Sequence, residues 1–362
     1  MKYILLFLIF IHGLIHVLGF VKAFEITSVN QLSIPISKPL GILWLISTLL
    51  FLVAGTLRLF NHSYWWLPLA LAIILSQTLI IFSWQDAKFG SIANIILFIV
   101  AVIGFATFQY QAYYQKEVKE YLLQKKYFDN EMITTADIAN LPEPVQRYLK
   151  YTGAIGKPKV NNFKITFKGQ IRKDEQSEWM PFTSEQYNFM HTPTRLFFMK
   201  AKMMKLPVAG YHCFKNGDAY MDIRLFSLIK VQYQDGPEMD MAETVTFFND
   251  MCCLAPPTLI DKRIQWIESK ENSVKASFTN NNITITAWLY FNEEGALINF
   301  VSNDRYAADA GKKLPWETPL KNYKAQHGYK IAGYADAIYT YPEKKLCYGQ
   351  FETVDVEYNL TE

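Results

Sequence analysis

The chain has little charge in its first third, and it lacks the short motifs that mark common catalytic sites. Only seven charged side chains lie in residues 1–110, although the 362 residues carry 36 Lys and Arg and 33 Asp and Glu. G-x-S-x-G, a glycine-rich phosphate loop, H-E-x-x-H and the protein-kinase motifs are all missing. The sequence therefore offers no recognisable carrier for covalent or phosphoryl-transfer chemistry, and it predicts no cofactor.

A strong net charge is also absent, and so is any cysteine pair at metal-site spacing. The formal net charge of +3 is small and scattered, which argues against nucleic acid as a partner. The four cysteines lie after residue 200 without a C-x-x-C pair, and neighbouring cysteines rarely bond to each other. We therefore predict buried free thiols rather than disulfides or a metal site at Cys213, Cys252, Cys253 and Cys347.

Long apolar runs fill the part of the chain that is poor in charge. They occupy residues 3–21, 40–60, 65–84 and 92–109. Each is close to the roughly 20 residues that an α-helix needs to cross a bilayer. The first run lacks a small-x-small cleavage site and three more runs follow, so we expect it to be retained. The sequence predicts a four-helix transmembrane bundle over residues 1–110, in a multi-pass protein of the cell membrane.

The side of the membrane is less well determined by the sequence. An even number of spans places both ends of the chain on one side, where lysine and arginine slightly outnumber those of the opposite loops. That count favours a cytoplasmic location for the region after the spans. Without the lysines of residues 111–120 the count reverses to two against three, so sidedness stays open.

Two histidines lie inside the first apolar run. His12 and His16 are four residues apart and therefore share one helix face. Ionisable groups inside a membrane are candidates for metal or haem ligands, or for a proton relay. The alternative is a pair of neutral imidazoles hydrogen-bonded to neighbouring helices. No second such pair occurs in another span, which favours the alternative.

The region after the spans changes from a helical to a strand period. We expect a juxtamembrane helix and linker over residues 111–140 and a soluble antiparallel β domain over residues 141–362. Within the latter, polar and apolar residues alternate over about a dozen segments joined by turns such as Lys215-Asn-Gly-Asp. A sheet of that size must curl, close or be covered. The prediction is therefore an α+β domain dominated by a large, curved, half-barrel-like antiparallel sheet.

One amphipathic helix interrupts this strand-rich sequence. It is predicted over residues 238–251, where it would cover the apolar face of the sheet. Glu238, Asp240 and Glu243 lie near its start, where acidic groups favourably meet the helix dipole. Asp250 lies at the unfavourable end and needs a partner such as Arg263 or Lys262. If one carboxylate of this chain is catalytic, Asp250 is the candidate.

Four segments resemble an uncharacterised bacterial family, a domain of unknown function that often follows N-terminal membrane spans. They are Leu-Pro-Glu-Pro-Val-Gln-Arg-Tyr-Leu from residue 141, Gly-Ala-Ile-Gly-Lys-Pro from 153, Trp-Met-Pro-Phe-Thr-Ser-Glu-Gln-Tyr from 179 and Gly-Pro-Glu-Met-Asp from 236. The resemblance covers roughly residues 135–358 and implies membership without an activity. The expected architecture is also similar, at the level of fold alone, to the half-barrel of bacterial lipoprotein-localisation carriers.

Met and aromatic residues are unusually frequent in two parts of this region. Flexible Met beside aromatic rings suits an adaptable apolar pocket, whereas the alternative is an ordinary core. Residues 196–204 are largely apolar on both strand faces, which a one-sided sheet would not need. The candidate ligand-binding residues are Phe197, Met199, Met203, Phe247, Phe248, Met251 and Leu254.

These patterns favour a membrane-anchored protein whose β domain binds a lipid or other apolar small molecule. Two alternatives remain: a hydrolase or other enzyme with an unrecognised site in the same concavity, and a membrane-tethered interaction or envelope-assembly module with a filled core. Membrane lipids are expected partners, and the sequence identifies no protein partner.

Overall fold

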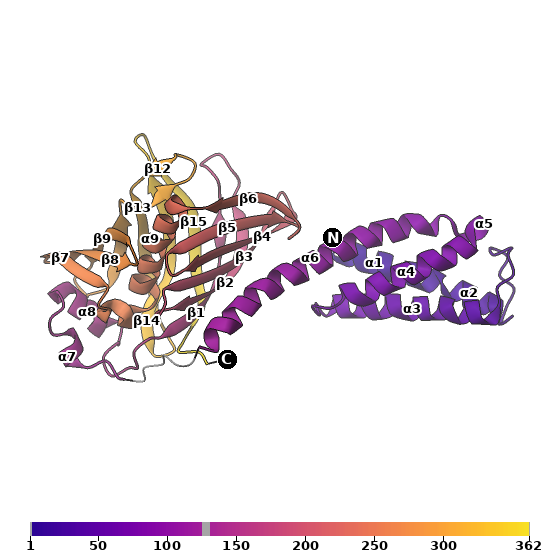
Figure 1. Ribbon diagram of the computed structural model, residues 1–362, viewed down its shortest axis with the longest axis horizontal. Coiled ribbons are helices and arrows are strands. Elements are labelled where there is room, and N and C mark those ends of the chain that lie inside the picture. The colour runs from indigo at the N-terminus through magenta and orange to yellow at the C-terminus, as the bar shows by residue number, and fades with distance from the viewer. Residues whose placement is uncertain (1, 125–130, 362) are drawn as a thin grey trace. The chain divides into compact units, whose positions relative to one another are not determined.

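The computed structural model describes residues 2–124 and 131–361, and the chain divides into two compact units, residues 1–113 and 114–362. Figure 1 labels the elements of both units. The first unit is helical and the second is built on a large sheet. Each unit is described on its own below.

The helical unit is made of apolar helices. In chain order they are α1 (Lys2–Ile15), α2 (Val17–Ala23), α3 (Lys38–Leu59), α4 (Trp66–Phe82), the short α5 (Trp84–Ala87) and the first part of α6 (Gly90–Leu122). Their buried seam includes Ile9, Phe51 and Leu69. Gly19 lets α2 lie close against α3, because a Cβ atom at this position would come within 2.3 Å of the Trp44 ring.

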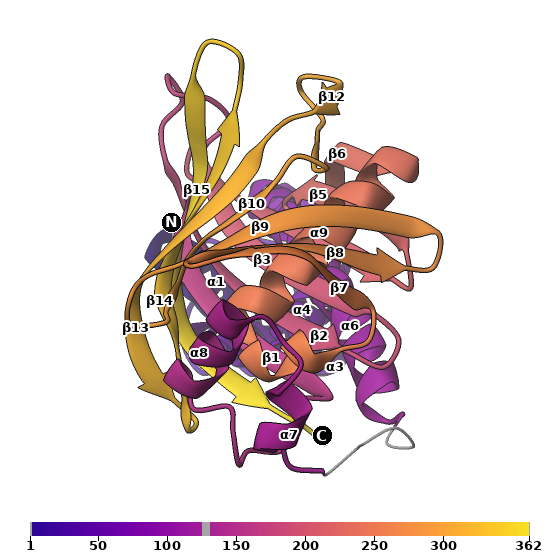
Figure 2. The same cartoon turned by 90° about the vertical axis from the view of Figure 1, so that its left-hand side faces the viewer.

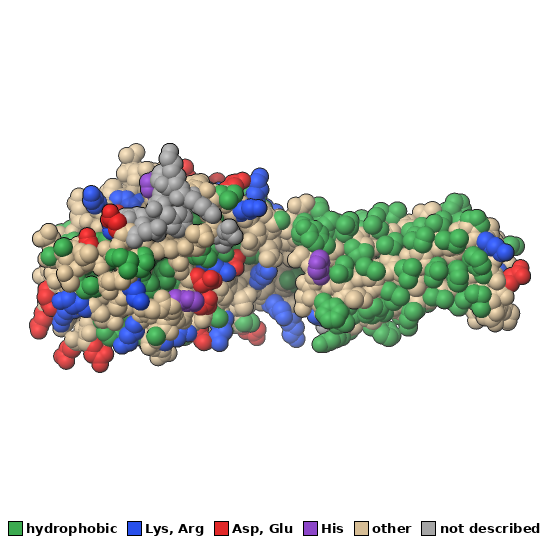
Figure 3. Space-filling view, turned by 90° about the horizontal axis from the view of Figure 1, so that it is seen from below, with side chains coloured by type: hydrophobic (Ala, Val, Ile, Leu, Met, Phe, Trp, Pro, Cys, Tyr) green, Lys and Arg blue, Asp and Glu red, His purple; other side chains and the backbone are tan. Residues whose placement is uncertain are grey.

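Three helical stretches of this unit are long and apolar enough to cross a membrane: Lys2–Ala23, Lys38–Leu59 and Gly90–Leu122. The sequence predicted four spans. The remaining one forms an apolar helix of 17 residues, Trp66–Phe82, which is shorter than the other three. Apolar side chains cover the visible face of the helical unit, whereas charged side chains of both signs are scattered over the β unit (Figure 3). This surface supports association of the helical unit with a membrane.

The second unit begins with the end of α6 and two short helices, α7 (Thr135–Ile138) and α8 (Glu143–Tyr151). Val145, Tyr148 and Leu149 form the buried stripe by which α8 packs on the β unit. The Tyr148 hydroxyl donates a hydrogen bond to the carbonyl oxygen of Cys252 at 2.8 Å. This bond fixes α8 against the end of the internal helix α9.

Thirteen strands form one antiparallel sheet that does not close. The order across it is β6-β5-β4-β3-β2-β1-β15-β14-β13-β10-β9-β8-β7, and β11 and β12 form a separate small ribbon. The strands are β1 (Asn162–Ile171), β2 (Met180–Phe189), β3 (Thr194–Met203), β4 (Leu206–Lys215), β5 (Asp218–Leu225), β6 (Ile229–Asp235), β7 (Ile264–Lys270), β8 (Ser273–Asn280), β9 (Ile283–Phe291), β10 (Leu297–Ser302), β11 (Tyr306–Ala307), β12 (Lys312–Lys313), β13 (Trp316–Gln326), β14 (Tyr329–Thr340) and β15 (Lys345–Tyr358).

Local sequence explains most of this meander. The turn Lys215-Asn-Gly-Asp joins β4 to β5 with Asn216 and Gly217 both at positive φ, which is the two-residue hairpin that the sequence predicted. In β9, Ile285, Ala287 and Leu289 are buried and alternate with less buried residues. The pairing of β1 with β15 then joins the two halves of the meander.

The helix α9 (Pro237–Leu254) and the 3-10 helix η2 (Pro256–Ile260) connect β6 to β7, the two edge strands of the sheet. Figure 2 shows the curved sheet with α9 lying inside the curve. The helix contacts β4, β5 and β6 as well as β9, β10 and β14. The sequence predicted a helix with one apolar face, but every residue from Ala242 to Leu254 is buried. The polar face of α9 meets polar partners on the sheet, and a sequence pattern cannot reveal such partners.

Candidate functional site

A cavity of about 270 Å³ lies beside α9 on the inner face of the sheet. This volume is many times the roughly 10–15 Å³ that a single buried water needs. Its wall is mainly apolar and is contributed by β1 to β5, α9 and β13 to β15. The apolar side chains that line it include Phe167, Ile171, Phe197, Met199, Met221, Ile223, Leu254, Trp316, Leu320 and Phe351.

The register of β3 explains how one strand lines this cavity and is still buried on both faces. Phe197 and Met199 point inward and line the cavity. Phe198 points to the opposite face, where the ring of Tyr114 from α6 stacks on it at 5.1 Å between ring centroids. The two-sided apolar character of residues 196–204 therefore has two causes, a cavity on one face and a helix on the other.

The same stretch of α6 carries a buried carboxylate that fastens it to β4. Glu117 accepts hydrogen bonds from the Tyr211 hydroxyl and from the Lys215 ammonium group, the latter at 2.5 Å. Burial and the contact with Glu117 both raise the pKa of Tyr211. Residues 114–122 are therefore part of the β unit and cover the outer face of its sheet.

A buried ionic cluster forms the polar end of the cavity. Arg195 of β3 donates from Nη1 to Glu243 Oε2 at 3.0 Å and from Nε to Asp250 Oδ2 at 2.9 Å. Its Nη2 donates to Gln186 Oε1 at 2.9 Å. Gln186 and Asn188 of β2 also donate to Asp250 Oδ2, at 2.8 and 3.2 Å. The guanidinium of Arg195 therefore joins β2 and β3 to α9.

A second guanidinium lies on the other side of Glu243. Arg305, just before β11, donates to Thr246 Oγ1 at 3.3 Å and to the Tyr339 hydroxyl. It lies over the Trp316 ring at 4.8 Å, and its Nη2 is 4.0 Å from Glu243 Oε1. Glu243 thus faces two guanidinium groups, from Arg195 and Arg305.

The two carboxylates respond differently to this environment. Burial by itself would raise the pKa of Glu243, but Arg195, His212 and Arg305 together lower the pKa to about 2. Burial raises the pKa of Asp250, and the contacts with Arg195 and Asn188 oppose this only in part. Two guanidinium groups and two carboxylates give a cluster of zero net charge when both acids are ionised.

The residues that the sequence singled out fall into three places. Phe197, Met199, Leu254 and Asp250 line the cavity. Phe247, Phe248 and Met251 are fully buried in the core, outside the cavity lining, and the Phe248 ring stacks on Phe278 at 5.3 Å between ring centroids. Met203 is partly exposed at the end of β3.

The two histidines of the first helix lie inside the helical unit. His12 Nε2 is 2.9 Å from Asn94 Oδ1, and His16 Nε2 is 2.7 Å from Ser76 Oγ. His12 of α1 therefore contacts α6, and His16, which lies between α1 and α2, contacts α4. Over residues 2–124 and 131–361, no group of three or more His, Cys, Asp or Glu side chains could hold a metal ion.

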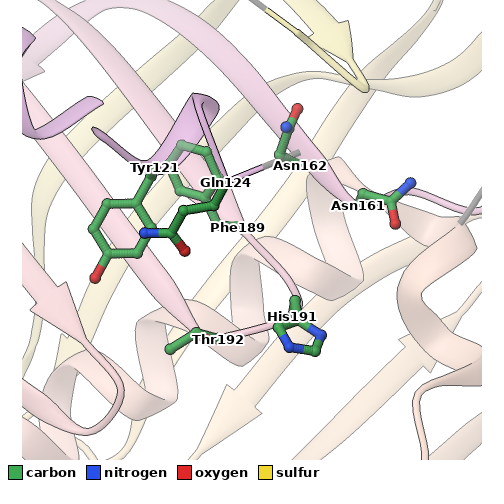
Figure 4. A pocket seen from close by; sticks show the side chains of 7 residues that line it. All are labelled: Tyr121, Gln124, Asn161, Asn162, Phe189, His191 and Thr192. Carbon is green, nitrogen blue, oxygen red and sulfur yellow. The ribbon is translucent and has the colours of Figure 1, made fainter. Parts of the chain in front are cut away.

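A second, much smaller pocket of about 30 Å³ lies near the end of α6. Figure 4 shows its seven lining side chains, among them Tyr121 near the end of α6, Gln124 just after α6, and Phe189 and His191 from the end of β2 and the following turn. It has room for about two waters by the same measure. A further hollow of about 630 Å³ is lined by Lys157, His327 and Glu357 among others. The cavity beside α9 is the candidate site because it joins a mainly apolar wall to a buried ionic cluster.

A sequence profile of a family of unknown function, DUF6544, matches residues 131–351. The chain belongs to this family. The resemblance to an uncharacterised family with a domain of unknown function is thus confirmed. No curated protein matches the chain.

Two solved structures overlap with this DUF6544 chain at low similarity. One is a DUF1329 family protein from Desulfovibrio piger, with 8% identity and a TM-score of 0.37, covering 64% of this chain and 95% of that one. The other is a β-barrel-like protein of the domain of unknown function DUF1849 from Brucella abortus, with 6% identity and a TM-score of 0.24, covering 56% and 99%. No function follows from overlaps of this size.

The sequence reasoning missed most of the polar end of this site. Arg195 and Gln186 were not considered, and Glu243 was attributed to the helix dipole. One signal was available for Arg195, which shares the inward register of β3 with Phe197 and Met199. A charge on the buried face of a strand requires a buried partner. The identity of that partner becomes visible only in the folded chain.

Proposed function

We propose that this protein is a membrane-anchored binding protein whose β unit holds a lipid or another apolar small molecule in the cavity beside α9. The observation that carries the proposal is the cavity itself, about 270 Å³ with a mainly apolar wall. Small-molecule sites generally combine an apolar wall with a few placed polar groups. The ionic cluster around Arg195 supplies such polar groups at one end.

Phe197, Met199 and Leu254 are the proposed contacts of the apolar part of the ligand. Asp250 is the proposed polar contact. Phe247, Phe248 and Met251 support the site from the opposite side of α9. We take α9 as the helix that covers the inner face of the sheet. The hydrogen bonds of this cluster to β2 and β3 also keep the helix in one position.

The helical unit is the proposed anchor, with four membrane passes. Trp66–Phe82 would be the short pass, since 17 residues of helix rise about 25 Å, which is near the lower limit for crossing a bilayer. Four passes place the N-terminus and the β unit on one side, which the lysine and arginine distribution favours as cytoplasmic. Reporter fusions at the C-terminus and in the loop around residue 30 should give opposite sides, and equal sides would refute four passes.

The binding proposal is tested with two neighbouring substitutions on β3. Met199 lines the cavity and Lys200 is exposed on the opposite strand face. Met199→Trp should fill the cavity, and Lys200→Trp should leave it open. The full chain and both variants are purified in the same detergent, denatured and extracted, and the lipid content is quantified by mass spectrometry.

We expect one lipid class that is retained by the parent chain and by Lys200→Trp and lost in Met199→Trp. Lipids that merely surround the helical unit should be equal in all three samples. Circular dichroism melts must show that Met199→Trp is folded. Equal profiles in the three folded samples would refute the proposal.

A further inference from the structure

The polar end of the cavity has unused hydrogen-bonding capacity on two carboxylates. All three hydrogen bonds to Asp250 reach Oδ2, and within the described residues none reaches Oδ1. The Asp250 side chain is only 9% exposed, and it lines the cavity. Buried acceptors without a partner are strongly unfavourable, so a water or a ligand must satisfy Oδ1.

Glu243 has a similar spare oxygen. Its Oε2 accepts from Arg195, whereas the cationic groups nearest to Oε1 in the described residues are His212 Nδ1 at 3.9 Å and Arg305 Nη2 at 4.0 Å. Both distances exceed the range of a hydrogen bond. Glu243 and Asp250 lie two turns apart on α9 and both line the cavity. Asp250 Oδ1 and Glu243 Oε1 are therefore spare acceptors, which a donor on the ligand would satisfy.

The guanidinium of Arg195 is mostly committed to protein acceptors. Its Nε, Nη1 and Nη2 already donate to Asp250, Glu243 and Gln186. A ligand carboxylate or phosphate would also face the spare oxygens of Asp250 and Glu243, which carry the same sign of charge. Like charges at such a distance in a buried site repel strongly.

A cationic ligand end is disfavoured by the charge balance. Arg195 and Arg305 offset Glu243 and Asp250 when both acids are ionised, and the three donors on Asp250 Oδ2 oppose the effect of its burial, which favours the neutral form. An ammonium group would add an uncompensated buried charge. A neutral donor satisfies the spare oxygens without changing the balance.

We propose that the ligand of this cavity is a single-chain amphiphile whose buried end is a neutral hydroxyl group, which donates to Asp250 Oδ1 or Glu243 Oε1. The inference rests on the proposed binding function and narrows the ligand class. It separates acyl compounds with a neutral hydroxyl head from fatty acids, phosphate-bearing lipids and alkylamines.

The test compares four probes of one chain length on the full chain in nanodiscs: decanol, decyl methyl ether, decanoate and decylammonium. Each probe competes with a neutral fluorescent alkyl alcohol for the cavity. The free aqueous concentration of the probe is measured after ultrafiltration. The cavity-filled Met199→Trp variant measures uptake by the bilayer, which is subtracted. Since a hydrogen bond to a charged acceptor contributes about 1.5–3 kcal/mol, decanol should bind roughly 10- to 100-fold more tightly than its methyl ether.

The Asp250→Asn variant provides a second test, because it should change the relative affinities for decanoate and decanol in a predictable direction. Removing one negative charge leaves the cluster positive, so the affinity for decanoate should rise relative to that for decanol. A purely structural role of Asp250 would weaken all four probes together. In the parent chain, equal binding of decanol and its ether, or tightest binding of decanoate, would overturn the inference and leave the binding function standing. Failure of all four probes to bind would overturn both.

Discussion

Replacing Arg195 by methionine should destabilise the β unit more than any surface substitution. The side chain is 9% exposed and joins Glu243 and Asp250, which are 2% and 9% exposed. Methionine keeps much of the apolar volume but leaves both carboxylates without their main cation. Removing one partner of a buried ion pair costs about 3–5 kcal/mol. The shift of the Glu243 pKa from 4.5 to about 2 corresponds to roughly 3 kcal/mol at about 1.4 kcal/mol per pKa unit.

The stability lost in Arg195→Met should depend on pH, and the pKa of Glu243 determines the direction of this dependence. In the parent chain the pKa of Glu243 is below its unfolded value, so its contribution is complete above about pH 4.5 and is lost as the pH falls towards 2. In Arg195→Met, burial remains and the guanidinium is gone, so the pKa of Glu243 should exceed its unfolded value. The variant then loses stability as the pH rises. The gap between the two proteins should widen between about pH 4 and about pH 7.

The assay must report on the β unit alone. Urea titrations of the full chain, read by hydrogen-exchange mass spectrometry on peptides of residues 237–254, confine the measurement to α9. Midpoint shifts convert to free energy through the slope of the titration. Lys168→Met is the control, since Lys168 and its partner Glu352 are 58% and 50% exposed and such pairs contribute about 0–1 kcal/mol.

Two results would refute this reasoning. One is a loss below about 1 kcal/mol for Arg195→Met at neutral pH, which would place the cluster in the same class as surface pairs. The other comes from the triple variant Arg195→Met, Glu243→Gln and Asp250→Asn. Removing the stranded charges should restore much of the lost stability, because neutral replacements of buried ion pairs are well tolerated. No recovery would mean that the charges are not the cause.

Three further outcomes follow from the same structure. Phe247→Ala removes a ring with no exposed surface and should cost about 3–5 kcal/mol in the same titration, with a loss below 1 kcal/mol contradicting its place in the core. Gly236→Ala should cost about 1–2 kcal/mol of stability, because φ is +87° at this position at the start of α9. Nothing lies within 4 Å of the added methyl group, so the cost comes from the backbone alone. Unchanged stability would exclude that backbone conformation. Cys347 should react with a maleimide well before Cys252, whose thiol is fully buried with a pKa raised by burial, and peptide mapping that finds the reverse order would contradict the burial of α9.

Much of the fold could be predicted because its signals are local. Apolar runs without charge indicate helices that suit a membrane, and three of the four predicted runs are long enough in the structure. The alternation of polar and apolar residues predicts the strands, and the Asn-Gly turn at residues 216 and 217 predicts a hairpin. Both signals depend only on residues that are close together in the sequence. A meander of such hairpins needs no distant information to set its register. The family resemblance, carried by contiguous segments, was likewise visible in the sequence.

Other features depended on contacts between distant parts of the chain. The pairing of β1 with β15 joins residues that are almost 200 positions apart, as in Phe163 with Tyr358, and it sets which face of the sheet is inside. The helix from 238 was predicted, but its burial on all sides was not, because Arg195 and Gln186 had no visible link to it. Both faces of β3 are buried because the end of α6 covers its outer face, and this contact was likewise not visible in the sequence.

The sequence by itself determined the division into an apolar helical part and a charged, strand-rich part, and it singled out Asp250 as a carboxylate in need of a partner. Hydropathy and period are properties of neighbouring residues, so folding is not needed to read them. The tertiary structure alone decided that Asp250 pairs with Arg195 from β3, 55 residues away, and that both lie at the end of an apolar cavity. Arg263, one of the two partners expected from the sequence, pairs with Asp261 instead. A buried charge announces that a partner exists, but only the packing of the sheet around α9 determines which residue it is.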